Sequence, residues 1–183
     1  MSVCLDSSLL RVVRCVIRRM AGESAGEWVL LSYRIPREPS TPRITVWRKL
    51  KKLGVAQIGD GLVALPADAR TREHLDWIAD EVLEAGGAAT VWLARPAAQA
   101  QELHLAREMA CARAAEYQEV LDDAAAARAM GEAERLRALT RLRERLRRIA
   151  RRDYFPPPEH HMARDAVEAL HPDRPDHTDQ ERT

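Results

Sequence analysis

The sequence predicts an α+β fold in which a small sheet-forming unit precedes a long helical hairpin. Between residues 28 and 96 the apolar pattern gives the order strand, helix, strand pair, helix and strand. From Ala98 to Ala129 there is neither glycine nor proline, which predicts one long helix. Apolar residues make up 46% of the chain and much of that share is alanine, so the sequence can form a core and favours helices.

Residues 28–35 are expected to form the first strand, because their apolar side chains alternate onto one face and Pro36 ends the run. An amphipathic helix follows, for which Ser40 or Thr41 is the expected N-cap. Gly54 is expected to end this helix, since glycine adopts the left-handed conformation that closes many helices.

The run VAQIGDGLVALP contains two short β-prone stretches around GDG, which is the composition of a tight hairpin turn. Asp68 and Thr71 are expected to cap the next helix, and Gly86 and Gly87 to end it. The apolar stripe of that helix is Leu75, Ile78, Val82 and Leu83. The run ATVWLARP supplies a fourth strand, so the complete order is the ferredoxin-like βαββαβ pattern.

The second half of the chain is expected to form a long antiparallel helical hairpin, joined near Met130 and Gly131. Its second helix carries the apolar seam Leu136, Leu139, Leu142, Leu146 and Ile149. Three consecutive prolines in DYFPPPEHH then end the helix. Tyr154 and Phe155 are expected to pack this corner onto the body of the protein.

Five segments are therefore predicted along the chain. They are an N-terminal extension at 1–27 with a short amphipathic helix, a ferredoxin-like domain at 28–96, a helical hairpin at 97–152, a Pro-rich corner with a short helix at 153–170, and a disordered polar tail at 171–183. No run is long and apolar enough to span a membrane. The three cysteines lack CxxC spacing, so we expect neither a zinc site nor a disulfide framework, and a reducing, cytoplasmic location.

Enzyme signatures are missing from the sequence. It contains no GxGxxG, Walker loop, GxSxG or HExxH, and His160 and His161 have no cysteine or carboxylate neighbours at ligand spacing. We therefore expect no catalytic residue, no cofactor and no metal.

Charge is distributed unevenly, although the net charge is only +1. Residues 34–52 carry seven lysines and arginines against one glutamate, and residues 132–152 carry nine arginines against three glutamates. Residues 67–123 carry twelve acidic against five basic residues. Two basic surfaces and one acidic surface are expected from this pattern.

The basic residues give two groups of candidate ligands for nucleic-acid phosphates or other anions. The first group is Arg34, Arg37, Arg43, Arg48, Lys49, Lys51 and Lys52, of which Arg34, Arg37 and Arg43 are also a candidate oxyanion cradle at a helix N-terminus. The second group is Arg141, Arg145, Arg148 and Arg152, expected on the outer face of the second hairpin helix. The alternative is that these arginines pair with the acidic first helix of the same hairpin. No helix-turn-helix is recognisable, so contacts to DNA would position a duplex rather than choose its sequence.

The stretch from Tyr33 to Pro66 resembles the ferredoxin-like domain of the small CRISPR-associated integration-complex nuclease and of the phenylacetic-acid repressor (PaaX) family. In the nuclease-like members an aspartate ends the first strand and helps to hold a divalent metal across a dimer. Arg34 occupies that position here, and a guanidinium repels a cation. Metal-dependent nuclease activity is therefore not expected.

A more extensive resemblance covers residues 28–170. The run from Trp28 to Pro66, the acidic helix after the fourth strand and the ending LRRIARRDYFPPP together resemble the N-terminal domain of the chromate-resistance regulator family, ChrB. The resemblance implies a non-enzymatic transcriptional regulatory module, with double-stranded DNA and chromate or another oxyanion as candidate partners. Family members often add a further domain after this region, which this chain is expected to lack. The alternative is a protein-interaction module that forms a homodimer through the sheet or the Leu136–Ile149 seam without binding DNA.

Overall fold

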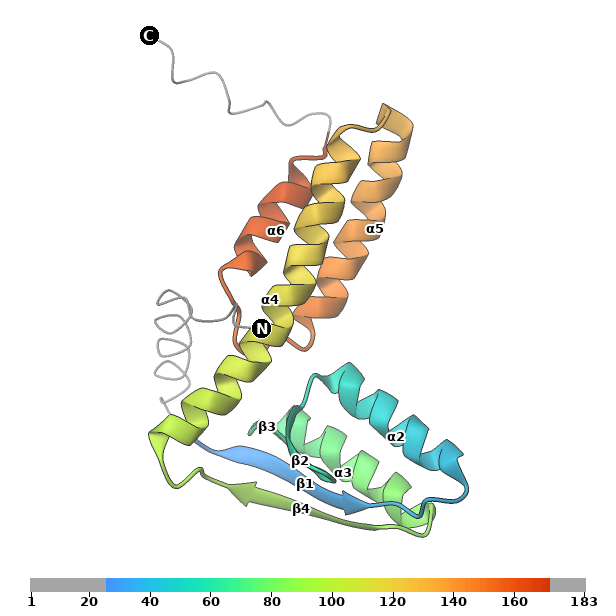
Figure 1. Ribbon diagram of the computed structural model, residues 1–183, viewed down its shortest axis with the longest axis vertical. Coiled ribbons are helices and arrows are strands. Elements are labelled where there is room, and N and C mark those ends of the chain that lie inside the picture. Colours follow the sequence, from blue (N-terminus) through green and yellow to red (C-terminus); the bar gives the residue numbers. More distant parts are fainter. Residues whose placement is uncertain (1–25, 172–183) are drawn as a thin grey trace.

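The computed structural model describes residues 26–171, and Figure 1 shows a sheet with two helices at one end and a helical bundle at the other. The predicted extension at 1–27 and tail at 171–183 lie almost entirely outside the described residues. The elements are β1 (Trp28–Arg34), α2 (Ser40–Leu53), β2 (Ala56–Gly59), β3 (Leu62–Pro66), α3 (Ala69–Glu84), β4 (Ala88–Ala94), α4 (Gln99–Arg128), α5 (Glu132–Ala150) and α6 (Glu159–Glu168). No helix within this range is long and apolar enough to cross a membrane.

The four strands form one antiparallel sheet in the order β2-β3-β1-β4. In the register of the central strands, Val29 of β1 lies opposite Leu65 of β3 and Leu93 of β4. Because side chains alternate along a strand, Val29 and Leu31 point to one face, where both are fully buried beneath α2 and α3. This order and layering confirm the predicted α+β class with a ferredoxin-like βαββαβ unit.

The helix ends of this unit follow the expected chemistry in three cases out of four. Gly86 ends α3 as expected, with φ of 73° and a hydrogen bond from its amide to the Leu83 carbonyl. Asp68 and Thr71 form a capping box at the start of α3, and Gly54 closes α2 in the left-handed conformation with φ of 74°. The prediction that Ser40 or Thr41 caps α2 is wrong, because Pro39 is the N-cap residue and makes no side-chain hydrogen bond. Ser40 is already the first helical residue, so its hydroxyl does not cap the first turn.

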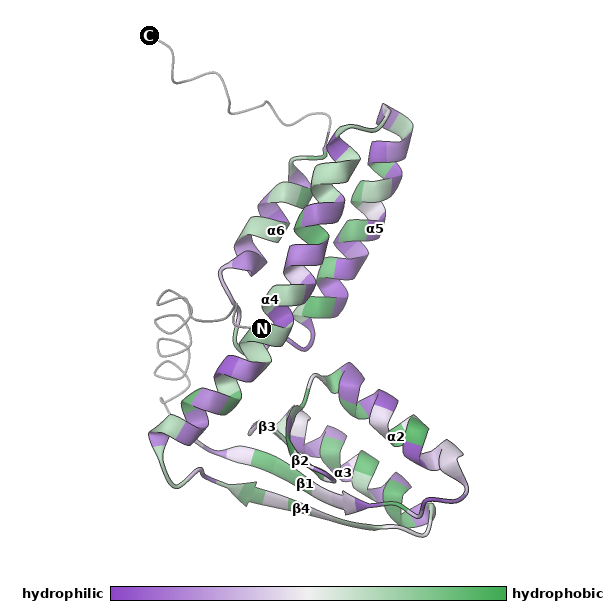
Figure 2. Ribbon diagram, in the orientation of Figure 1, coloured by the Kyte–Doolittle hydropathy of each residue, from purple (hydrophilic) through white to green (hydrophobic). Residues whose placement is uncertain are grey.

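The long helix α4 belongs to two hydrophobic cores. Its first half places Ala106 and Met109 in the core of the sheet unit, whereas Tyr117 and Val120 of its second half lie in the core of the bundle. Figure 2 shows hydrophobic and hydrophilic residues alternating along α5, as expected for a helix that buries one face. The helix therefore links the two parts of the fold as a continuous rod (Figure 1).

The bundle contains the predicted hairpin and a third helix, α6, packed against both α4 and α5. Leu139, Leu142 and Ile149 of the predicted seam are buried inside it, while Leu136 is exposed. Most of the predicted seam is therefore buried within the chain. In α3, the predicted stripe member Leu83 is also exposed, because only Leu75, Ile78 and Val82 reach the core.

The Pro-rich corner packs onto the sheet unit as predicted. Phe155 is buried and its ring lies 6.0 Å from that of Trp28, with an interplanar angle of 29°. The Tyr154 hydroxyl donates a 3.3 Å hydrogen bond to the carbonyl of Leu53 at the end of α2. These contacts hold the end of α5 against the last turn of α2.

Candidate nucleic-acid interface

A groove of about 680 Å³ lies beside α2, between the end of β1 and the β2–β3 hairpin. Arg34 from the end of β1 and Arg43 and Arg48 from α2 line it together with the indole of Trp47. Three of the predicted basic residues, taken from two elements, therefore share one concave surface. We call this surface the α2 groove.

The orientation of α2 explains why its basic residues face outward. The helix buries Val46 and Leu50 against the sheet, so the opposite side of the helix, including Arg48 and Lys51, faces solvent. Trp47 has 49% of its surface exposed, and the Lys51 Nζ atom lies 4.4 Å from the centre of its ring. This cation–π contact places the Lys51 ammonium over an exposed aromatic ring next to the arginines of the α2 groove.

The arginines of the α2 groove are not paired with acidic side chains of the described residues. Arg34, Arg43 and Arg48 form no ion pair with any other residue in the range 26–171. The one carboxylate in the lining is Asp60. Guanidinium groups in this arrangement suit phosphate or another oxyanion, because each can donate two parallel hydrogen bonds.

Tyr33 adds a neutral hydrogen-bonding group to the lining. Burial raises the pKa of the Tyr33 phenol, and the negative charge of Asp60 raises it further. The phenol therefore stays protonated at neutral pH and can donate a hydrogen bond to an anion in the groove.

Other members of the first basic group lie elsewhere. Lys49 forms an ion pair with Glu81 of α3, and Lys52 lines a different groove on the α3 side of α2. Arg37 is exposed in the loop after β1 but does not line the α2 groove, where Arg48 lies instead. Of the three residues expected to form an oxyanion cradle, Arg34 and Arg43 line the α2 groove and Arg37 does not.

The second basic group divides into paired and free side chains. Arg145 contacts both Glu119 and Asp123 of α4, with 2.8 Å to the Asp123 Oδ2 atom, and Arg152 pairs with Glu116 of α4. These two arginines point toward α4, so the expectation that they lie on the outer face of α5 is wrong. Arg141 and Arg148 are exposed and form no ion pair within the described part of the chain.

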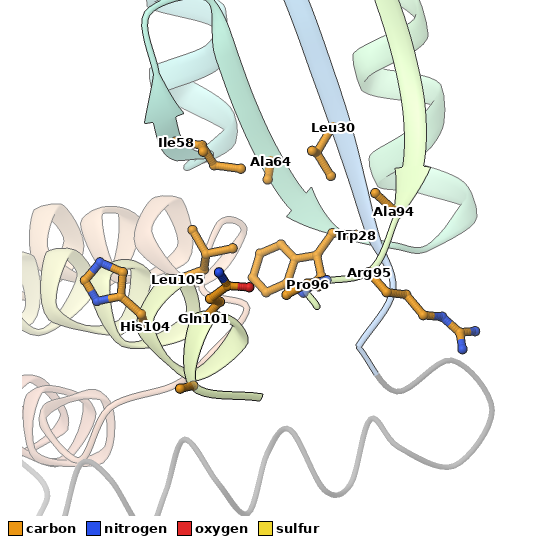
Figure 3. A pocket seen from close by; sticks show the side chains of 11 residues that line it. Trp28, Leu30, Ile58, Ala64, Ala94, Arg95, Pro96, Gln101, His104 and Leu105 are labelled. Atoms are coloured by element: carbon orange, nitrogen blue, oxygen red, sulfur yellow. The ribbon is translucent and has the colours of Figure 1, made fainter. Parts of the chain in front are cut away.

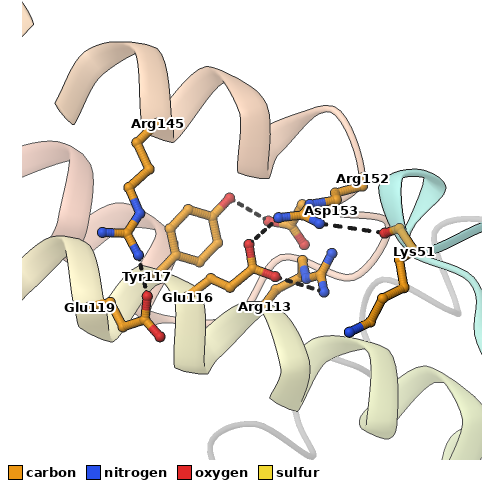
Figure 4. Close-up of polar contacts among 8 residues, drawn as sticks. All are labelled: Lys51, Arg113, Glu116, Tyr117, Glu119, Arg145, Arg152 and Asp153. Carbon is orange, nitrogen blue, oxygen red and sulfur yellow. Dashed lines mark hydrogen bonds and ion pairs between the residues drawn. The ribbon is translucent and has the colours of Figure 1, made fainter. Parts of the chain in front are cut away.

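The end of α5 forms a charged junction between the bundle and the sheet unit (Figure 4). Arg113 is only 12% exposed and lies 2.9 Å from Glu116, which also holds Arg152. A weak 3.5 Å hydrogen bond runs from Arg152 Nη1 to the carbonyl of Lys51 in α2. Sequence reasoning missed Arg113 and Glu116, because their single charges on an Ala-rich helix carry no motif.

A second, apolar groove of about 530 Å³ lies on the sheet face that α2 and α3 leave open (Figure 3). Leu30, Ala64 and Ile58 of the sheet face Leu105 and Gln101 of α4 across it. Trp92, opposite Leu30 in the register, has 55% of its surface exposed on the same face. This groove was also not predicted, since the alternation of the strands shows two faces but not which one remains uncovered.

The remaining residues that could carry chemistry in the described range are its histidines and Cys111. Among residues 26–171 no three His, Cys, Asp or Glu side chains come together as a metal site. His160 packs 5.3 Å from the Tyr117 ring, and burial lowers its pKa, with further lowering by His161 and Arg164. Cys111 is disulfide-bonded, so the expectation of a reduced thiol is wrong for this residue.

These features define the class of protein as a two-part α+β domain, in which a ferredoxin-like sheet is joined to a helical bundle and a basic groove runs beside α2. Residues 43–181 match the family model described as "Protein ChrB, N-terminal". The chain belongs to the ChrB N-terminal family, which confirms the resemblance inferred from the sequence. The match begins in α2, so Arg34 and Arg37 lie before it.

A curated relative gives the same assignment. Protein ChrB of Cupriavidus metallidurans is 29% identical over 133 residues, which is 70% of this chain and 40% of that protein. The chain thus matches less than half of the relative's length. No solved structure matches this chain.

Proposed function

We propose that this ChrB-family domain is a non-enzymatic regulatory module of chromate resistance that contacts double-stranded DNA through the α2 groove and the outer face of α2. The observation that carries the proposal is the set of exposed cations there, Arg34, Arg43, Arg48 and Lys51, beside the exposed indole of Trp47. None of these cations forms an ion pair with a residue between 26 and 171. Unpaired cations on one surface neutralise phosphates and release counterions, which favours binding to a duplex.

A further exposed cation lies near the end of α5. The last turn of α2 meets the end of α5 at the Lys51–Arg152 contact, and the two helices leave that point in different directions (Figure 1). Arg148, near this end of α5, is exposed, and we include it as a further candidate for a phosphate contact. Such contacts set the position of a duplex without reading its bases. The proposal requires a cytoplasmic location.

Fluorescence anisotropy with a labelled duplex over a salt series tests the proposal. Binding that weakens steeply with salt is expected, with a slope of about −0.9 in log K against log salt for each phosphate neutralised. The absence of duplex binding at low salt would remove DNA contact from the function.

A second candidate function is binding of chromate or a related oxyanion in the same groove. It is favoured by the shared lining of Arg34, Arg43 and Arg48, of which Arg43 lies near the first turn of α2, a turn that has no side-chain cap. Calorimetry with chromate and with sulfate, repeated on Arg34→Ala, tests this idea. Equal heats for both proteins would exclude Arg34 from an oxyanion site.

The alternative of a homodimerising interaction module rests on the open sheet face. Exposed Trp92 and Ile58 lie on that face beside the apolar groove. Light scattering on the purified chain tests it, and a monomer at micromolar concentration would count against it.

A further inference from the structure

A groove of about 370 Å³ lies on the side of α2 that faces α3, away from the α2 groove. Its lining comes from α2, α3 and the end of α5, which are brought together by the packing of the Tyr154 corner. The residues that give it its chemistry are Lys52, Arg70, His74, Trp77 and Arg151. We call it the α3 groove.

The α3 groove has an excess of unpaired positive charge. Lys52, Arg70 and Arg151 are exposed and form no ion pair within residues 26–171. The two acids in the lining are already engaged, because Asp68 accepts a 2.7 Å hydrogen bond from the Thr71 amide and Glu81 pairs with Lys49. Three cations from three separate elements therefore share a concave surface, and none of them forms an ion pair with a carboxylate of the described residues.

An exposed aromatic ring lies in the same groove. Trp77 has 57% of its surface exposed, although most large aromatic side chains in a domain of this size are buried. The His74 ring meets it edge to face, with centroids 5.9 Å apart and planes at 90°. His74 thus contacts the indole of Trp77 on one side, and the rest of the indole is open to solvent. A ring that stacks on a ligand needs such an open face.

We propose that the α3 groove binds a free nucleotide, with the base stacked on Trp77 and the phosphate held by Arg70, Lys52 and Arg151. An aromatic face beside several cations matches the two chemical parts of a nucleoside phosphate, since bases stack on indoles and phosphates bind guanidinium and ammonium groups. The groove volume lies within the range of small-molecule sites. This site is separate from the DNA surface proposed above and would give the domain a small-molecule ligand.

Isothermal titration of the full chain with adenosine 5′-monophosphate tests the proposal, with adenosine and inorganic phosphate as partial ligands. The nucleotide is expected to bind more tightly than either part. Arg70→Ala and Trp77→Leu are each expected to weaken binding about tenfold, because each removes one half of the recognition. Arg72→Ala is the matched control, since Arg72 lies on the same helix, pairs with Asp76 and does not line the groove.

Circular dichroism melting curves establish that the variants are folded. The proposal is overturned if the nucleotide does not bind at millimolar concentration, if inorganic phosphate binds equally well, or if Arg70→Ala and Arg72→Ala bind alike. It is also overturned if a single-stranded oligonucleotide binds and the free nucleotide does not. The variant Arg43→Glu/Arg48→Glu should retain nucleotide binding, so failure of the DNA proposal can be told apart from failure of this one.

Discussion

The Tyr117 hydroxyl on α4 donates a 2.8 Å hydrogen bond to the Asp153 carboxylate just beyond α5. Tyr117 is fully buried, and the two residues lie 36 positions apart in the sequence. The bond closes the α4–α5 hairpin where the bundle meets the sheet unit, next to the Arg152–Glu116 ion pair (Figure 4). It therefore helps to fix the relative positions of the two parts of the fold.

Replacement of Tyr117 by phenylalanine should lower the free energy of unfolding by about 1–3 kcal/mol, because it leaves the half-buried Asp153 carboxylate without this donor. Urea unfolding followed by circular dichroism measures the change. Tyr154→Phe is the control, since the Tyr154 hydroxyl donates a longer bond of 3.3 Å to a carbonyl. An equal or larger decrease in the free energy of unfolding for Tyr154→Phe would contradict the conclusion that the Tyr117–Asp153 bond stabilises the fold more than the Tyr154 bond.

Stability should fall at alkaline pH in a way that depends on Tyr117. Burial raises the pKa of Tyr117 far above its ordinary value of 10.0, and the Asp153 charge raises it further. Above about pH 10 the unfolded chain loses this proton while the folded chain keeps it, so the unfolded state binds fewer protons and the free energy of unfolding decreases as pH rises. Unfolding curves at several alkaline pH values should show a shallower decrease for Tyr117→Phe, with Tyr33 and Tyr154 responsible for the remainder. Parallel decreases in both proteins would refute this assignment.

Gly54 should not tolerate a side chain. Its φ is 74°, and a Cβ atom there would lie 2.9 Å from the Cβ of Arg152 and 3.1 Å from the Arg152 carbonyl oxygen. Gly54→Ala is therefore expected to cost about 1–2 kcal/mol for the backbone conformation alone, with the steric contact added to it. Gly131→Ala is the matched control, because a Cβ at Gly131 meets no atom within 4 Å and its φ is −60°. Thermal melting measures both, and similar melting temperatures would show that α2 and the end of α5 are not in close contact.

The two predicted helix caps should behave differently on mutation. Asp68→Ala removes the capping box of α3 and should cost about 0.5–2 kcal/mol. Ser40→Ala should change stability by no more than a few tenths of a kcal/mol, because Ser40 makes no cap hydrogen bond. Chemical denaturation of both variants measures the free energy of unfolding. A substantial decrease for Ser40→Ala would indicate that Ser40 does cap α2, as the sequence predicts.

The strands, the hairpin and the helix ends at Gly54 and Asp68 could be predicted from the sequence, because each depends on a local signal. Alternation places Val29 and Leu31 on one face, and a capping box lies within four residues. The partner of a helix face is not a local property. The sequence therefore did not show that Ala106 of α4 packs on the sheet while Tyr117 packs in the bundle.

The sequence predicted which residues of the candidate site are charged. It did not predict how those side chains are arranged in space. The position of Arg145 on α5 follows from helical spacing, whereas its pairing with Glu119 depends on how α4 packs beside α5. Lys49 likewise belongs to the basic helix, yet it reaches Glu81 on the neighbouring helix. The sequence could not separate such neutralised cations from Arg43 and Arg48, which remain unpaired within the described residues.

Duplex binding by Arg43→Glu/Arg48→Glu is the most direct test of the proposed function. The matched control is Arg128→Glu/Arg137→Glu, which makes the same change in net charge at exposed positions near the tip of the α4–α5 hairpin. Anisotropy over a salt series should show that the first variant loses at least about tenfold in affinity and that its salt slope is shallower by about 2, while the control retains the affinity of the wild type. Equal losses in the two variants would show that net charge rather than the α2 groove governs binding, and would contradict the proposal.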